Sequence, residues 1–186
     1  MNSIFLHQVF TRKGLICQKL SKGKGIALDK KKTKYLVMDV DGTLTDGKIY
    51  MGNSGEMMKA FNIKDGCGIH DILLPAGIIP IIITGRQSDI VINRCREIGI
   101  TDIYQGINNK LEKLNNISSD LSCVAYIGDD INDLSCMRSI KSAGGLIGCP
   151  KNAVKQVLDL VDYISDYDGG DGAVRDFIEW ICYGFS

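Results

Sequence analysis

Apolar and polar positions alternate in short blocks along most of the chain, from residue 35 onward. Short apolar or β-branched runs, most of them ending in Gly, Asp or Thr, predict buried strands. We expect strands at Tyr35–Val40, Ile78–Thr84, Ile103–Gln105, Val124–Ile127, Leu146–Gly148 and Tyr163–Ile164. Longer amphipathic segments lie between them. We expect helices at Gly66–Leu74, Ser88–Ile98, Asn109–Ile117, Asp130–Ser139, Ala153–Leu160 and Ala173–Tyr183.

A further pair of short segments predicts a β-hairpin. Lys48–Met51 and Met57–Phe61 flank the turn-forming residues Gly52-Asn53-Ser54-Gly55. Outside the hairpin, strand and helix alternate about six times, which is typical of an α/β fold with a doubly wound, Rossmann-like parallel sheet. Such sheets bind ligands beyond the carboxyl ends of their strands. Functional residues are therefore expected directly after the strands.

Composition and charge divide the chain into two parts. The 186 residues have a formal net charge of zero. Residues 1–34 carry nine basic residues and one acidic residue, a charge of +8, so residues 35–186 carry −8. We expect 1–34 to be a basic, poorly ordered extension with at most one short helix, and 35–186 to be a single globular domain.

Several classes of protein are disfavoured by the sequence. The seven cysteines are scattered and form no C-x-x-C pair, which indicates free thiols in a reducing cytoplasm. No apolar run reaches the length of a membrane span, and no secretory cleavage site follows the first residues. A nucleic-acid binder would need a basic face, whereas the predicted domain is acidic. We therefore expect neither a membrane nor a nucleic-acid partner.

The residues that follow the predicted strands carry the chemistry. Asp39-Val40-Asp41-Gly42-Thr43-Leu44-Thr45-Asp46-Gly47 ends the first strand, and Thr84-Gly85-Arg86 ends the second large one. Lys110 opens the helix after 103–105, and Gly128-Asp129-Asp130-Ile131-Asn132-Asp133 follows 124–127. Each motif alone is compatible with a turn or a helix cap. Together, in this order and at strand ends, they predict a site for a metal ion and a phosphate group.

The chemistry of these side chains suggests a reaction. Carboxylates a few ångströms apart repel one another and require a cation, and an all-oxygen ligand set with room for water suits Mg²⁺. The metal, Lys110, the Thr84 hydroxyl and nearby backbone N–H groups could then neutralise a phosphate. One carboxylate could attack phosphorus, and its neighbour two residues on could protonate the leaving oxygen and later activate water.

These four motifs resemble those of the haloacid dehalogenase superfamily of phosphotransferases, over residues 35–180. The resemblance implies a Mg²⁺-dependent phosphatase that works through an aspartyl-phosphate. It makes Asp39 the nucleophile and a metal ligand, and Asp41 the general acid and base, with a backbone carbonyl on the metal. Thr84 and Lys110 would hold the phosphoryl group.

The resemblance also assigns the acidic residues after the strand at 124–127. Asp129 would be the third protein ligand of Mg²⁺, and Asp133 a supporting carboxylate behind the ligands. Asp130 stays open, since it could contact the metal through water or only cap the following helix. The gaps between motifs are 42 residues from Asp41 to Thr84 and 18 from Lys110 to Asp129, too short for the cap domain of larger relatives. An uncapped site is open to water, so we expect an oligomer whose neighbouring subunit covers it.

Longer segments resemble the uncapped phosphatases of 3-deoxy-manno-octulosonate 8-phosphate, enzymes of lipopolysaccharide core synthesis. The matching segments are 46–69, 82–86, 94–110, 126–130 and 169–176. The resemblance implies a homotetramer built around the hairpin and a sugar-acid phosphate as substrate. It also implies a Gly-rich tail that helps to cover an active site, although 169–172 could equally be a plain loop. The substrate-binding candidates are Gly85, Arg86, Lys64 and Arg175.

Two alternatives stay open. A related phosphatase acting on a nine-carbon, sialic-acid-type 9-phosphate would share all four motifs. Such relatives tend to have an acid after Thr-Gly, so Arg86, which can form a two-pronged contact with a carboxylate, favours the eight-carbon substrate. A module of this kind also occurs joined to cytidylyltransferases, where it mainly serves oligomerisation. The complete set of motif residues argues against a catalytically inactive copy.

Overall fold

A computed structural model describes residues 33–184 of the chain, so the predicted basic extension lies almost wholly outside the described residues. Six parallel strands form the central sheet, in the order β5-β4-β1-β6-β7-β8. Their bounds are Tyr35–Met38 (β1), Ile79–Ile83 (β4), Asp102–Tyr104 (β5), Val124–Ile127 (β6), Leu146–Cys149 (β7) and Tyr163–Ile164 (β8). The predicted doubly wound parallel sheet is therefore confirmed.

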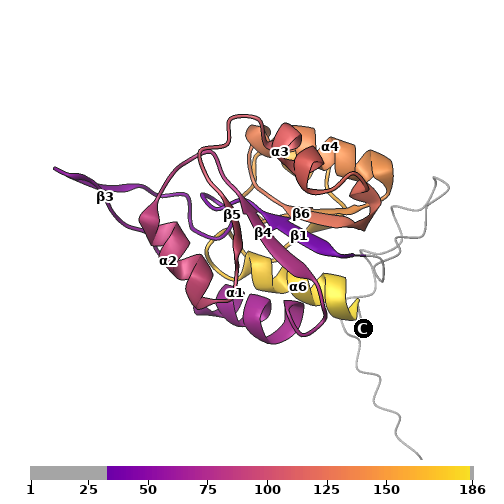
Figure 1. Cartoon of the computed structure of the whole chain (residues 1–186), viewed down its shortest axis with the longest axis horizontal. Helices are drawn as coiled ribbons and strands as arrows, with labels where there is room; N and C mark the ends of the chain where they lie inside the picture. The colour runs from indigo at the N-terminus through magenta and orange to yellow at the C-terminus, as the bar shows by residue number, and fades with distance from the viewer. Residues whose placement is uncertain (1–32, 185–186) are drawn as a thin grey trace, which may run out of the picture.

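Helices cover both faces of the sheet (Figure 1). One face carries α1 (Ile63–Cys67), the π-helix η2 (Gly68–Leu73), α2 (Asp89–Glu97) and α6 (Ala173–Tyr183). The other face carries α3 (Lys110–Ile117), α4 (Leu134–Ala143) and α5 (Lys155–Leu158). Two short 3₁₀ turns, η3 (Leu121–Cys123) and η4 (Ile131–Asp133), flank β6. None of the helices in this described part of the chain is long and apolar enough to cross a bilayer.

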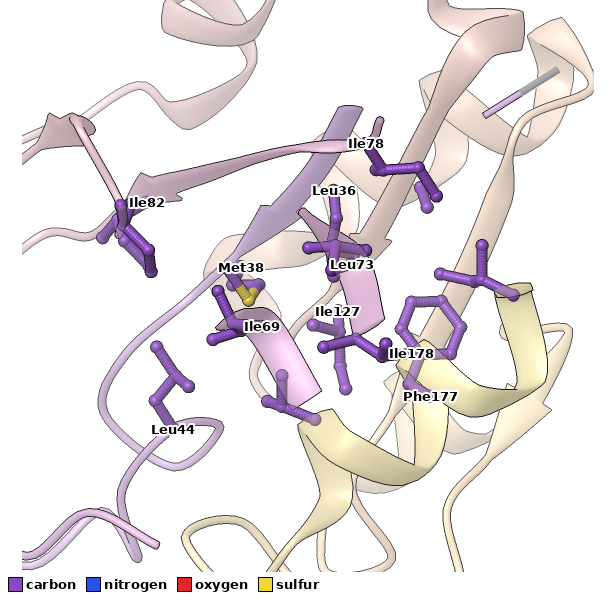
Figure 2. Packing of buried hydrophobic residues seen from close by; sticks show 14 of the residues in the cluster. Leu36, Met38, Leu44, Ile69, Leu73, Ile78, Ile82, Ile127, Phe177 and Ile178 are labelled. Atoms are coloured by element: carbon purple, nitrogen blue, oxygen red, sulfur yellow. The ribbon is translucent and has the colours of Figure 1, made fainter. Parts of the chain in front are cut away.

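The alternation of side chains along the strands builds one core on each face. In β1, Leu36 and Met38 point to the core beneath α6, and Val37 points to the core beneath α4. Figure 2 shows Met38 near Ile69, with Ile178 of α6 on the same side of the sheet. Because both faces are covered, most positions in the strands are apolar rather than alternating with polar residues.

Some predicted boundaries differ from the structure for local reasons. The helix predicted at Gly66–Leu74 begins earlier, at Ile63, because the Asn62 side chain accepts a hydrogen bond from the Lys64 N–H and caps it. The helix predicted at Asp130–Ser139 begins as the 3₁₀ turn η4 and continues to Ala143. The helix predicted from Ala153 begins at Lys155, since Val154 is extended and its N–H donates to the Asp129 carbonyl.

The predicted hairpin is present as β2 (Tyr50–Gly52) and β3 (Gly55–Met58). It extends away from the body of the molecule (Figure 1). Large apolar side chains on and beside it are exposed, including Met51 at 63% and Met57 at 66%. An apolar surface of this kind is typical of a contact site for another protein chain.

Candidate active site

The motif residues meet at the carboxyl ends of β1, β4 and β6. Most of them line an open pocket of about 360 Å³, formed by Asp39, Asp41, Gly42, Asp46, Gly47, Thr84, Gly85, Arg86, Asp129, Asp130, Asn132 and Asn152, whereas Lys110 and Asp133 are buried and do not line it. Parallel strands place all their carboxyl ends on one edge, so residues far apart in the sequence come together there. The structure thus places most of the motif residues at this edge of the sheet, where the sequence predicts the functional residues.

A tight turn after β1 positions the first motif. Asp39 continues the sheet, since its N–H donates to the Ile127 carbonyl at 3.1 Å. The chain then folds back, and the N–H groups of Thr43, Leu44 and Thr45 all converge on the Val40 carbonyl at 3.0–3.2 Å. This turn brings Asp39 and Asp41 to the same pocket.

Glycine is required at position 42 for two reasons. Its φ of +95° is a backbone conformation that other residues rarely adopt. A Cβ atom there would also lie 2.0 Å from Oδ2 of Asp129. The missing side chain therefore allows the Asp129 carboxylate to approach the first motif.

Lys110 is buried between two carboxylates. Its ammonium lies 2.9 Å from Oδ1 of Asp39 and 2.8 Å from Oδ1 of Asp133. Asp133 is fully buried, and its Oδ1 also accepts a hydrogen bond from the Tyr126 hydroxyl at 2.7 Å. Lys110 is thus fixed beside the predicted nucleophile.

The combined effect of burial and neighbouring charges raises the pKa values of both Asp39 and Lys110. Burial raises the pKa of Asp39 to about 6, and the Asp133 charge adds to that effect, while Lys110 opposes it. Burial disfavours the charged form of Lys110, but Asp39 and Asp133 outweigh it and raise the pKa of the ammonium. Lys110 therefore stays positively charged at neutral pH.

Asp129 is the second carboxylate that faces the pocket. Its Oδ1 accepts a hydrogen bond from the Thr43 hydroxyl at 2.9 Å. Burial raises its pKa to about 7 despite that hydrogen bond, and the charges of Asp39, Asp133 and Asp130 add to the rise. A carboxylate in such surroundings is stabilised by a nearby cation.

The donor set fits a hard divalent cation. Oxygen atoms of Asp39, Asp129 and Asp133 lie within 4.8 Å of one another. Asp133 is already engaged, since Oδ1 accepts from Lys110 and Tyr126, and Oδ2 accepts from the N–H groups of Asp129 at 3.1 Å and Asp130 at 3.3 Å. This leaves Asp39 and Asp129 as the carboxylates that would hold Mg²⁺, together with the backbone carbonyl of Asp41, the other predicted protein ligand.

Asp130 and Asp133 form a capping box around η4. The Asp130 side chain accepts from the Ile131 N–H at 2.7 Å, and Asp133 accepts from the Asp130 N–H. Of the two roles left open for Asp130, the cap is the one that the structure displays. A Cβ at Gly128 would lie 2.4 Å from Oδ2 of Asp133, so that glycine makes room for the folded-back carboxylate.

Thr84, Gly85 and Arg86 occupy the rim contributed by β4. Backbone hydrogen bonds hold this segment, since the Thr84 N–H donates to Tyr104 and the Thr84 carbonyl accepts from Ile107, both at 3.0 Å. Thr84 is buried and Arg86 is partly exposed at the pocket. Of the predicted substrate-binding residues, Gly85 and Arg86 thus line the same pocket as Asp39.

Lys64 and Arg175 lie elsewhere. Within residues 33–184 of one chain they line a different pocket, of about 280 Å³, together with Tyr167 and Gly172. The structure therefore does not bring these two predicted substrate-binding residues to the pocket of Asp39.

The Gly-rich segment before α6 packs against the first motif from behind. The Gly170 N–H donates to the Thr43 carbonyl at 3.0 Å, and a Cβ at Gly169 would lie 1.8 Å from the Gly42 carbonyl oxygen. Close backbone approach thus accounts for these glycines. In one chain the segment supports the turn that follows β1.

Sequence reasoning missed three side chains at the site. Lys59 pairs with both Asp41 and Glu56. Glu56 lies in β3 and Lys59 directly follows it, in a hairpin whose local sequence pattern does not indicate contacts with distant residues. Tyr126, which supports Asp133, could have been suspected, because a hydroxyl in a fully buried strand needs a hydrogen-bond partner.

Known proteins share this sequence and fold. No family model matches the chain. The 3-deoxy-D-manno-octulosonate 8-phosphate phosphatase KdsC of Escherichia coli K12 is 42% identical over 147 residues, which cover 77% of this chain and 76% of the relative. The crystal structure of the Moraxella catarrhalis phosphatase of that name, in complex with magnesium, phosphate and KDO, has a TM-score of 0.76 and 41% identity, covering 82% of this chain and 87% of that one.

A third similarity links the chain to the wider superfamily. A Legionella pneumophila hydrolase of the HAD superfamily, subfamily III A, has a TM-score of 0.75 and 38% identity, and the match covers 82% of this chain and 83% of the neighbour. Together with the four motifs at one sheet edge, these similarities show that the chain is a phosphatase of the haloacid dehalogenase superfamily. It belongs to the family of 3-deoxy-D-manno-octulosonate 8-phosphate phosphatases.

Proposed function

We propose that this protein hydrolyses 3-deoxy-D-manno-octulosonate 8-phosphate with the help of Mg²⁺. The observation that carries the proposal is the buried Lys110, held 2.9 Å from Asp39 at the edge of an open acidic pocket. The named relatives act on this sugar-acid phosphate, and the Moraxella structure contains magnesium, phosphate and the sugar acid. Each supports the same substrate class.

The side chains have distinct roles in this reaction. Asp39 attacks phosphorus as the phosphorus–oxygen bond to the sugar breaks, and this forms an aspartyl-phosphate. Asp41 donates a proton to the departing sugar oxygen and then accepts one from the water that hydrolyses the aspartyl-phosphate. Lys110 and Thr84 hold the phosphoryl oxygens. Bound Mg²⁺ would neutralise negative charge shared by the carboxylates and the phosphate.

Arg86 is the residue that we assign to the carboxylate of the sugar acid. It lines the pocket, and its guanidinium is oriented by acidic neighbours at the rim. A planar guanidinium matches a carboxylate in two parallel hydrogen bonds. The nine-carbon alternative has weaker support, because the relatives with 40–42% identity carry the eight-carbon name.

We also propose a homotetramer assembled through the hairpin. The exposed apolar residues that support it are Ile49, Tyr50, Met51, Met57 and Met58. Assembly would bring a second subunit near each open pocket, and only in this way could Lys64 or Arg175 of one chain reach the substrate of another. The reaction is assigned to the cytoplasm and to lipopolysaccharide synthesis, in line with the family.

A phosphate-release assay tests the function directly. Purified protein is incubated with eight-carbon and nine-carbon keto-acid phosphates, with Mg²⁺ or with a chelator. We expect release from the eight-carbon substrate in the presence of Mg²⁺ and none from the Asp39→Asn variant, whose fold is checked by circular dichroism. Equal release by that variant would rule out Asp39 as the nucleophile, and a preference for the nine-carbon substrate would refute the substrate assignment.

A further inference from the structure

Four charged side chains, two from the hairpin segment and two from the residues that follow β1 and β4, form a closed ring of ion pairs. Lys59 contacts Asp41 directly and lies 3.1 Å from Oε1 of Glu56. Arg86 completes the ring, with Nη2 at 3.1 Å from the same Glu56 oxygen and Nε at 3.7 Å from Oδ2 of Asp41. Each carboxylate therefore has two cationic partners, and each cation has two carboxylate partners.

The ring joins three separate parts of the fold. Asp41 follows β1, Glu56 and Lys59 belong to the hairpin and its return, and Arg86 follows β4. Glu56 is further held by Ser88, whose hydroxyl donates to Oε2 at 2.5 Å. The side chain that could have capped α2 is thus used to fix the ring instead.

Lys59 is the buried member of the ring. Its side chain is 1% exposed, against 20% for Asp41 and 42% for Arg86. An ammonium so far from water is stable only beside negative charge, and both Asp41 and Glu56 supply it. Arg86 lines the pocket, whereas Lys59 lies behind Asp41, so Lys59 acts on the site through another residue.

We propose that Lys59 is a positioning residue for the catalytic reaction, which holds the Asp41 carboxyl group in the orientation that both proton transfers need, protonated when it donates to the leaving oxygen and ionised when it accepts from water. The inference rests on the proposed role of Asp41. Without Lys59, the remaining cation near Asp41 is Arg86, which is more distant and is also assigned to the substrate. Phosphate binding by Lys110 and Thr84 is not touched by the ring, so the loss falls on turnover rather than on substrate affinity.

The first test compares Lys59→Met with Lys155→Met. Lys155 also pairs with an aspartate at 2.8 Å, but it is exposed on α5 and does not line the pocket of Asp39. With 3-deoxy-D-manno-octulosonate 8-phosphate, we expect Lys59→Met to lower kcat at least tenfold with KM changed less than threefold, and Lys155→Met to match the wild type. A Lys59→Met kcat within twofold of the wild type overturns the proposal.

Pre-steady-state kinetics with p-nitrophenyl phosphate add a signature that a merely structural role would not produce. Its good leaving group needs no proton donor, whereas hydrolysis of the aspartyl-phosphate still needs a base. Lys59→Met should therefore release about one p-nitrophenol per active site in a burst, followed by a slow steady rate. A slow rate without a burst would contradict a positioning role.

A second variant keeps the test decisive if Lys59→Met does not fold. Glu56→Gln opens the ring at a partly exposed residue and removes the shared anchor of Lys59 and Arg86. We expect its kcat on p-nitrophenyl phosphate, which has no carboxylate for Arg86, to fall at least threefold; an unchanged kcat refutes the ring's role. If the wild type releases phosphate from neither substrate, the proposed function itself fails, and that outcome is distinct from an active wild type with unaffected variants.

Discussion

Asp133 and Lys110 form a fully buried ion pair, with Oδ1 and Nζ 2.8 Å apart. Replacing Asp133 with Asn removes one of the two negative charges that compensate the Lys110 ammonium. Asp39 alone must then compensate that buried positive charge. We expect Asp133→Asn to lower the free energy of unfolding by about 3 kcal/mol and to lower kcat strongly. Urea unfolding and phosphate release measure the two effects.

Tyr126→Phe is the matched control, because it removes only a hydroxyl that donates to Asp133 at 2.7 Å. It leaves both charges in place, so the loss of stability should be about 1 kcal/mol. If the two variants were equally destabilised, the charge on Asp133 would have no special part in holding Lys110.

Gly42→Ala is expected to weaken Mg²⁺ binding. The new Cβ would lie 2.0 Å from Oδ2 of Asp129, and this would push one predicted metal-binding carboxylate out of place. Gly77→Ala shares the positive φ but meets nothing within 4 Å, so it reports backbone strain alone, about 1 kcal/mol. Calorimetric titration with Mg²⁺ should show at least tenfold weaker binding for Gly42→Ala only. Equal Mg²⁺ affinities of Gly42→Ala and the wild type would show that the position of the Asp129 carboxylate does not depend on glycine at 42.

Asp65 makes stability depend on pH. It is buried in α1 and accepts a hydrogen bond from the Arg175 N–H at 2.8 Å, at the first turn of α6. Burial raises its pKa to about 6, although backbone N–H groups of α6 oppose the rise. The folded state therefore binds this proton more tightly than the unfolded state. The resulting contribution to the free energy of unfolding is complete below about pH 4 and is lost as pH rises through 6.

Asp65→Asn should remove this dependence, because the amide is neutral at every pH and can still accept the same hydrogen bond. Between pH 4 and pH 7, we expect the stability of the variant relative to the wild type to increase by about 2 kcal/mol. Urea unfolding at both pH values gives the difference. A constant difference across that range would contradict the raised pKa.

The hairpin prediction concerns assembly. Replacing Met51 and Met57 with Glu places charge on the exposed apolar surface that we assign to the subunit contact. Light scattering should show the proposed tetramer for the wild type and smaller species for the double variant. Ile164→Glu, which alters an exposed apolar residue on β8 at 47% exposure, should leave the mass unchanged. If the double variant stays tetrameric, the hairpin is not part of the subunit interface.

Much of the fold could be predicted from local patterns. Val124–Ile127 and Ala173–Tyr183 have the predicted boundaries because their apolar periodicity coincides with flanking turn residues. The bounds of the helical segment at 63–73 are less predictable from sequence, since its start depends on a cap by Asn62 and its second half is a π-helix. A pattern with a period of 3.6 residues does not anticipate that change of hydrogen bonding.

The sequence by itself determined the strand–helix alternation and the set of motif residues, because parallel strands deliver their carboxyl ends to one edge whatever the loops between them. It could not determine the partners of Asp41. Lys59 is 18 residues from Asp41, and Glu56 is 30 residues from Arg86, so no short-range pattern relates them. Only the tertiary structure brings the hairpin segment against the ends of β1 and β4. There Lys59 is buried, so its positive charge must be compensated by the carboxylates of Asp41 and Glu56.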